Sequence, residues 1–190
     1  MKYYILFGPP GAGKGTQAAA MAERYNLKHI STGELLRSEI AAGTELGKQA
    51  KALIDEGNLV PDEMVEQMLS EAFNAHSDVD GFLLDGFPRT LSQAVDLDNI
   101  LTENGEEVTG VISLMIPDAM VHERIKHRAT IEGRADDASD EIISHRISTY
   151  HAKTEPLIAF YKPDGKYHEI DGSGTVEQVR GNIFYLMDKL

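Results

Sequence analysis

The stretch from Tyr3 to Thr16 constrains the fold of this chain more than any other. An apolar run at 3–7 (YYILF), typical of a buried strand, leads directly into the sequence GPPGAGKGT at 8–16. The alanine-rich segment 17–25 that follows is expected to form a helix. In this context, glycines let several backbone amides surround an anion, and the N-terminus of the helix points at the same place. The pattern Gly-x4-Gly-Lys therefore predicts a phosphate-binding loop.

Two details of the loop refine this prediction. Lys14 supplies the mobile positive charge that such loops direct toward the outer phosphates of a nucleotide. Gly15 stands where the general motif has a Ser or Thr that ligates magnesium, and Thr16 comes one place later. We therefore expect magnesium to be held largely by phosphates and water.

Two other interpretations of the loop remain. The segment 13–18 (GKGTQA) also fits the loose dinucleotide pattern G-x-G-x-x-A, but a nicotinamide-binding turn has no use for a lysine among its glycines. A glycine-rich turn that binds nothing is the second alternative. The strand expected before the loop and the helix expected after it argue against that interpretation.

Composition bounds the class of protein. The 190 residues suit one domain with small insertions, and a net charge of −13 argues against nucleic acid or an anionic membrane as the main partner. The absence of cysteine excludes disulfides and thiolate zinc sites, which suits a reducing compartment. The apolar segment after Lys2 is too short for a secretory signal, and no stretch is long enough to span a membrane. We expect a soluble, cytoplasmic protein.

Strands and helices are expected to alternate along the chain. The expected strands are 3–7, 27–30, 81–85, 108–116 and 166–170. This alternation predicts an α/β fold with a five-stranded, mainly parallel sheet flanked by helices, and ligands at the carboxyl ends of the strands.

Three further segments are expected to lie around this core. Two helices between 31 and 57 predict a small helical lobe. The polar stretch 129–137 predicts a short loop suited to a lid over phosphates, and one long helix is expected over 139–161.

A second chemical stretch is GFLLDGFPR at 81–89. Asp85 ends an apolar strand, where an acid beside a phosphate loop faces magnesium or its waters; the alternative is an aspartate that only caps the following turn. Arg24 and Arg180 fall in ordinary helices. The other six arginines fall near the motifs, which favours phosphate binding by their guanidinium groups: Arg37, Arg89, Arg124, Arg128, Arg134 and Arg146.

Four segments follow one another along the chain in this order: GPPGAGKGTQ, STGELLR, GFLLDGFPRTLSQA and GRADD. Together they closely resemble the adenylate kinase family, and the resemblance extends from Tyr3 to the final helix. The short interval between Arg128 and Arg134 is similar to the short-lid form of the family, which lacks the longer lid that can carry zinc.

The resemblance implies a P-loop NTPase fold and reversible transfer of the γ-phosphoryl group of ATP to AMP, giving two ADP. It also implies Mg²⁺ with ATP, no zinc, nucleotides as the partners and a monomeric state. The implied division is a core of 1–30, 61–127 and 138–190, an AMP-binding lobe of 31–60 and a lid of 128–137.

The resemblance also carries site residues over by motif position. The implied catalytic residues are Lys14, Arg89, Arg128, Arg134 and Arg146. ATP would be held by Gly11, Ala12, Gly13, Lys14, Gly15, Thr16, Arg124, Arg128 and, near the base, Gly174. AMP would be held by Thr32, Arg37, Asn58, Leu59, Val60, Gly86, Phe87, Pro88, Arg89, Gln93, Arg134 and Arg146. Asp85 would hold magnesium through water, and Asp136 and Asp137 are expected to orient Arg134 or cap the next helix.

Two rivals stay open. A UMP/CMP kinase would share the architecture, but the Gln93 amide can accept from adenine N6-H₂ and donate to N1, and Thr32 matches the adenine-reading form of the STG motif. A P-loop switch protein would bind one nucleotide. It would leave the Arg37, Arg89 and Gln93 cluster unexplained.

Overall fold

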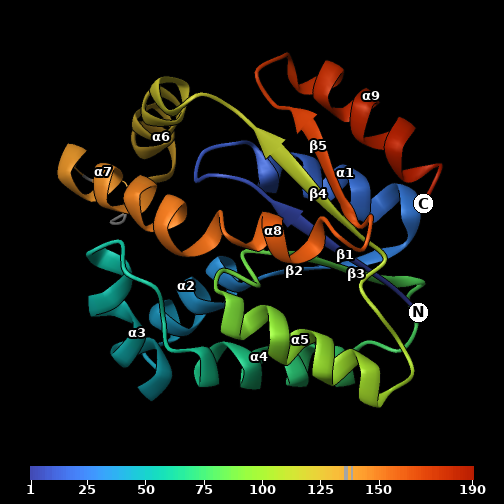
Figure 1. The fold of residues 1–190 in the computed structure, drawn as a ribbon. Helices are drawn as coiled ribbons and strands as arrows, with labels where there is room; N and C mark the ends of the chain where they lie inside the picture. The colour runs from blue at the N-terminus through green and yellow to red at the C-terminus, as the bar shows by residue number, and fades with distance from the viewer. Residues whose placement is uncertain (135–136, 138) are drawn as a thin grey trace.

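Figure 1 shows a central sheet with helices on both faces. The structure is a computed structural model, which describes residues 1–134, 137 and 139–190. The strands are β1 (Lys2–Phe7), β2 (Leu27–Ser31), β3 (Gly81–Asp85), β4 (Gly110–Met115) and β5 (Tyr167–Asp171). They lie in the order β2-β3-β1-β4-β5, and every neighbouring pair is parallel. The prediction of a five-stranded parallel sheet flanked by helices is confirmed.

Strand β1 lies at the centre of the sheet and carries both halves of the core. Tyr3, Ile5 and Phe7 pack with side chains of the helices on one face, and Tyr4 and Leu6 pack with those on the other. The first face is covered by α4 (Asp62–Ala75), α5 (Leu91–Glu103) and α8 (Leu157–Tyr161), the second by α1 (Lys14–Tyr25) and α9 (Val176–Met187). Successive strand residues point to opposite faces, so a strand buried on both sides is apolar throughout, as 3–7 is.

The sheet topology places a crevice at the end of β1. From β1 the chain goes out to β2, returns through β3 and then crosses β1 to form β4. Such a reversal opens the ligand-binding crevice of parallel sheets, beyond the carboxyl ends of the strands. The loop after β1 must pass close to β4 there. A Cβ on Gly8, which has φ +143°, would lie 2.6 Å from the Leu114 carbonyl oxygen, so this position requires glycine.

The expected pair of helices after β2 is present as α2 (Thr32–Ala42) and α3 (Glu45–Asp55). Gly43 ends α2 at φ +68°, and the Thr44 side chain caps α3 by accepting from the Gly47 amide at 3.0 Å. A Cβ on Gly47 would lie 2.2 Å from the Glu39 carbonyl oxygen, so the two helices cross in close contact. Their role as a nucleotide-binding lobe stays a prediction.

The predicted polar loop at 129–137 is wrong in its first part, because α6 (Asp118–Glu132) continues to Glu132. No residue from 129 to 132 breaks a helix, and the helix ends only where Gly133 adopts φ +61°. Of the predicted lid, Ala135 and Asp136 lie outside the described residues. Val121 and Ile125 pack against Ile143 of α7 (Asp140–Thr149) in a small apolar cluster that joins the two helices.

The single long helix predicted for 139–161 is also wrong. Helix α7 ends at Thr149, a π-helical turn η2 (Tyr150–Thr154) follows, and α8 begins only at Leu157. Pro156 has no amide hydrogen to continue the ladder, and the Glu155 amide donates to the Tyr150 carbonyl at 2.8 Å, one residue beyond α-helical spacing. The strand predicted for 108–116 is shorter than expected, at 110–115.

Within residues 1–134, 137 and 139–190, no helix is both long enough and apolar enough to cross a bilayer.

Candidate active site

A cleft of about 850 Å³ opens at the carboxyl edge of the sheet. It is lined by the loop after β1, by α2, by the segments around 58 and 86, by α6 and α7, and by the turn before α9. Most of the predicted site residues line it: Gly11, Ala12, Gly13, Lys14, Gly15, Thr16, Thr32, Arg37, Asn58, Leu59, Val60, Asp85, Gly86, Arg89, Gln93, Arg124, Arg128, Arg134, Arg146 and Gly174. Residues from positions 11 to 174 of the chain are thereby gathered around one cavity.

Two predicted AMP residues do not line this cleft. Phe87 is 1% exposed and belongs to the hydrophobic core, and Pro88 borders a smaller neighbouring cavity of about 80 Å³. Their predicted contacts with AMP stay a prediction.

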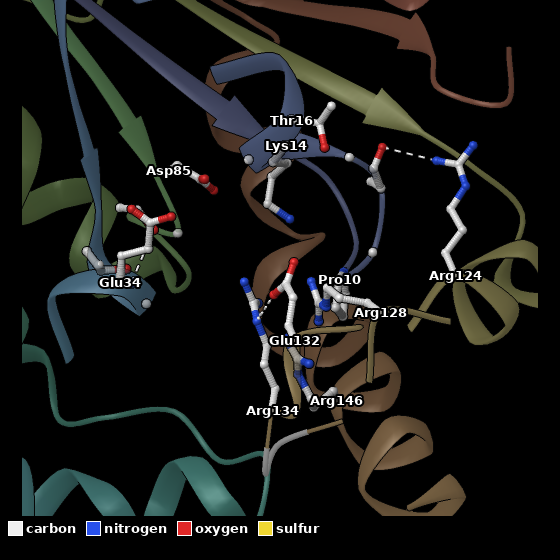
Figure 2. A pocket seen from close by; sticks show the side chains of 18 of the residues that line it. Pro10, Lys14, Thr16, Glu34, Asp85, Arg124, Arg128, Glu132, Arg134 and Arg146 are labelled. Carbon is white, nitrogen blue, oxygen red and sulfur yellow. Dashed lines mark hydrogen bonds and ion pairs between the residues drawn. The ribbon is translucent and has the colours of Figure 1, made fainter. Parts of the chain in front are cut away.

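The loop after β1 is built to receive an anion. Gly13 caps α1 at φ +95° without a side-chain hydrogen bond, so no side chain occupies the first amides of the helix. Lys14 Nζ donates to the carbonyl oxygens of Gly8 (3.0 Å) and Pro9 (3.1 Å), which folds the lysine back across the loop (Figure 2). Arg124 donates to Ala12 O at 3.3 Å and Gly172 O at 2.9 Å, and so ties the loop to the turn after β5.

The surroundings of Lys14 disfavour its charged form. Burial lowers its pKa from 10.5 to about 8, and the positive charges of Arg89, Arg146 and Arg128 act in the same direction. The Asp85 carboxylate acts in the opposite direction without restoring the usual pKa. A phosphate bound in the loop would supply the negative charge that Lys14 lacks here.

Asp85 is held in its ionised form beside the loop. Burial alone would raise its pKa, but contact with His29 and the positive charges of Lys14 and Arg89 outweigh burial and lower it. His29 Nε2 lies 3.4 Å from Asp85 Oδ2. The sequence did not single out His29, because its proximity depends on β2 pairing with β3, which strand patterns alone do not specify.

Three arginines approach the loop from α6, α7 and the connection between them (Figure 2). Arg128 makes a bidentate contact with Asp137, at 2.7 Å for Nε–Oδ2 and 2.8 Å for Nη2–Oδ1, and Arg146 Nη1 also bonds Oδ1. The Asp137 side chain has no exposed surface. One buried carboxylate thus holds two guanidinium groups at the cleft wall.

The predicted role of Asp137 is therefore wrong, since it orients Arg128 and Arg146 instead of Arg134. The cap of α7 is Ser139, whose Oγ accepts from the Ile142 amide at 3.2 Å. Arg134 pairs with Glu132 instead, at 2.5 Å between Nε and Oε2. Asp136 lies outside the described residues.

Part of the cleft lining, called the slot below, consists of apolar side chains and one buried amide. Leu36, Ile54, Val60 and Val65 line it, together with Gln93, which is only 2% exposed. Apolar walls with a single positioned polar group suit a flat heteroaromatic base.

Contacts with Gln93 fix its amide at both ends. Gln93 Oε1 accepts from the Arg89 backbone amide at 2.7 Å, and Nε2 donates to Asp62 Oδ1 at 2.7 Å. Asp62 and Glu132 were not singled out from the sequence. Asp62 lies 31 residues from Gln93 along the chain, and nothing in the sequence pattern links the two.

Gly86 lies in the cleft wall, close to the side chains of Thr32 and Arg89. A Cβ at Gly86, which has φ +88°, would lie 2.6 Å from Thr32 Oγ1 and 2.9 Å from Arg89 Nη2. Arg89 Nε donates to the Gly86 carbonyl at 2.7 Å. The absence of a side chain at 86 therefore lets the Thr32 and Arg89 side chains both lie close to the Gly86 backbone at the cleft wall.

Comparison with known proteins agrees with this geometry. The family model described as adenylate kinase matches residues 6–166. An adenylate kinase of Flavobacterium johnsoniae is 46% identical over 186 residues, and one of Bacteroides thetaiotaomicron is 44% identical over 186 residues, each alignment covering 98% of both chains. An adenylate kinase of Porphyromonas gingivalis is 42% identical over 185 residues, 97% of this chain and 95% of the relative. This chain belongs to the adenylate kinase family.

Proposed function

We propose that this protein catalyses reversible transfer of the terminal phosphoryl group of ATP to AMP, giving two ADP. The observation that carries the proposal is the cleft whose lining combines a phosphate loop, several arginines and the apolar slot around Gln93. A protein that only bound and hydrolysed one nucleotide would need no second slot. The names of its relatives support the same reaction.

ATP would bind at the loop end and AMP at the slot. The amides of 11–16 and Lys14 would hold the donor phosphates, with Arg124 and Gly174 toward the ATP base. Thr32, Arg37 and Gln93 would bind AMP, together with 58–60 and Gly86. The predicted contacts of Phe87 and Pro88 would then be made by their backbone.

The reaction depends on the position and charge of the groups that hold the two nucleotides, and it needs no general base. A phosphate monoester has a second pKa near ~6, so AMP is already mostly dianionic at neutral pH and can attack without losing a proton to the protein. Arg89, Arg128, Arg134 and Arg146 would align the two polyanions and offset the charge that spreads over the transferred group. Alignment of two bound substrates can lower a barrier by about 7–11 kcal/mol.

Magnesium would accompany ATP. No group of three or more metal-ligating side chains gathers within the described residues, and one ionised carboxylate suits an ion that takes its other ligands from phosphates and water. Asp85 would hold it through water. When bound, the ion would neutralise phosphate charge. No zinc is proposed.

Closure of the cleft would exclude water and prevent hydrolysis of ATP. The residues 31–60 would move as the AMP-binding lobe and 128–137 as the lid, against a core of 1–30, 61–127 and 138–190. The protein would act as a cytoplasmic monomer on small nucleotides, with no nucleic-acid or membrane partner.

The decisive experiment measures initial velocities with ATP and magnesium against AMP, UMP, CMP and GMP, following formation of nucleoside diphosphate. A strong preference for AMP is expected. Preference for UMP or CMP would assign the chain to the pyrimidine rival. Absence of transfer, together with no equilibrium binding of AMP alone, would favour the nucleotide-switch rival.

A further inference from the structure

We propose that Asp62 determines the base selectivity of the AMP slot by fixing the orientation of the Gln93 amide. The inference rests on the proposed placement of AMP, because Gln93 must face the base for its orientation to matter. Asp62 would act as a positioning residue, through Gln93 and without touching the nucleotide.

The two ends of the Gln93 amide meet partners of opposite kinds. The Arg89 backbone amide can only donate, and it meets Oε1 at 2.7 Å. The Asp62 carboxylate can only accept, and it meets Nε2 at 2.7 Å. A rotated amide would set its NH₂ group against the N-H of Arg89 and its oxygen against the carboxylate. Water cannot relieve that mismatch readily, since Gln93 is 2% exposed.

The fixed amide keeps one free position at each end. An amide oxygen accepts two hydrogen bonds and an amide nitrogen donates two, and the described residues use one at each end of Gln93. Gln93 also lines the cleft, so a base in the slot would use these remaining positions.

Orientation then decides which purine fits. Adenine presents an N6-H₂ donor beside the N1 acceptor, and guanine presents an O6 acceptor beside an N1-H donor. With its present orientation, the Gln93 amide can accept from N6 and donate to N1 of adenine. The rotated amide would instead donate to O6 and accept from N1-H of guanine. The Asp62 carboxylate stabilises the orientation that favours adenine.

Asp62 is also the first residue of α4, where any acid interacts favourably with the helix dipole. Glu63 provides the matched control, because it lies in the same first turn and is exposed. If the role of Asp62 were purely structural, its replacement would lower stability or overall rate. The ratio of kcat/KM between two acceptor nucleotides would then stay unchanged.

The test compares kcat/KM for AMP and GMP at saturating ATP and magnesium, in the wild type, Asp62→Ala, Asp62→Asn and Glu63→Ala. Asp62→Ala should lower the AMP-to-GMP ratio about tenfold, the effect of losing one hydrogen bond to a charged group. Asp62→Asn is nearly isosteric, so it tests the proposal even if the alanine variant folds poorly. Its neutral amide can accept or donate, and the ratio should fall about threefold. Glu63→Ala should keep the ratio.

The variant Gln93→Ala distinguishes failure of the proposed AMP placement from failure of the role given to Asp62. If it leaves the ratio unchanged, Gln93 does not read the base and the proposed AMP placement fails. If it collapses the ratio while both Asp62 variants retain it, the AMP placement stands and the role given to Asp62 is overturned.

Discussion

Arg134 forms an ion pair with Glu132 inside the cleft, with 2.5 Å between Nε and Oε2. Figure 2 shows the Glu132 carboxylate beside Arg134, on the side that faces Lys14. A carboxylate binds a guanidinium group with the same fork geometry as a phosphate. Glu132 therefore occupies the arginine much as a substrate phosphate would, and a nucleotide that binds Arg134 as proposed would have to displace it.

Replacing Glu132 with Gln should strengthen nucleotide binding. The variant removes a negative charge from a cleft that receives polyanions and keeps the shape of the side chain. We expect the KM values for ATP and AMP to fall about two- to tenfold. This corresponds to removal of about 0.5–1.4 kcal/mol of competing interaction between Glu132 and Arg134. Steady-state kinetics would check this at low and high salt, since screening should reduce the gain.

Glu123→Gln is the control for Glu132→Gln, because Glu123 is an exposed acid on the same helix outside the cleft. An equal change in KM in both variants would show an effect of net charge and contradict a specific role for Glu132.

Arg134→Ala should lower kcat far more than it weakens binding of either nucleotide alone. A group that meets the transferred phosphoryl only in the closed complex contributes mainly to the transition state. We expect a loss of about 10²- to 10³-fold in kcat, with Kd values for single nucleotides changed by less than about fivefold. Equal losses in rate and in binding would contradict a role in the closed lid. Lys162→Ala, at an exposed lysine outside the cleft, is the control.

Asp137→Asn should lower the free energy of unfolding. Asp137 carries the charge that Arg128 and Arg146 share, and its side chain has no exposed surface. Removing one partner of a buried ion pair costs about 3–5 kcal/mol, so the free energy of unfolding should fall by roughly that amount. Urea unfolding measures the loss. A variant as stable as the wild type would show that Asp137 is dispensable for holding the two arginines.

The fold was predictable where local pattern decides it. The apolar run 3–7 and the following glycines specify a buried strand and a phosphate loop, and both occur as expected. The end of α6 was not predicted, because polar residues at 129–132 suggested a loop although nothing there breaks a helix. Helix ends depend on such marginal preferences, while buried strands depend on a large hydrophobic term.

The site was predictable only for residues within motifs. Lys14, Asp85 and Arg89 stand at fixed positions in recognisable segments. His29, Asp62 and Glu132 contact partners that strand pairing, helix packing or the length of α6 bring close. Such contacts between side chains are set by tertiary structure, so a single sequence does not reveal them.

The lowered pKa of Lys14 predicts an alkaline limit to ATP binding. In the free enzyme, Lys14 carries its charge below about pH 8 and loses it above, because its pKa is lowered from 10.5 to about 8. We expect kcat/KM for ATP to fall above about pH 8 with the loss of one proton, while kcat at saturating ATP falls at higher pH because bound phosphates favour the charged lysine. In Lys14→Met the residual activity should lack this alkaline limb.

The same pKa shift predicts how stability depends on pH. Between pH 8 and 10.5 the unfolded chain binds more protons at Lys14 than the folded chain, so Lys14 makes the free energy of unfolding rise with pH in this window. Below pH 8 the folded protein bears the full free-energy cost of the partly buried charge. Lys14→Met should therefore be more stable than the wild type by about 1–3 kcal/mol at pH 7, with the difference vanishing toward pH 10.5. Urea unfolding at both pH values measures this, and a difference that is equal at pH 7 and pH 10.5 would reflect packing alone, without a contribution from the charge.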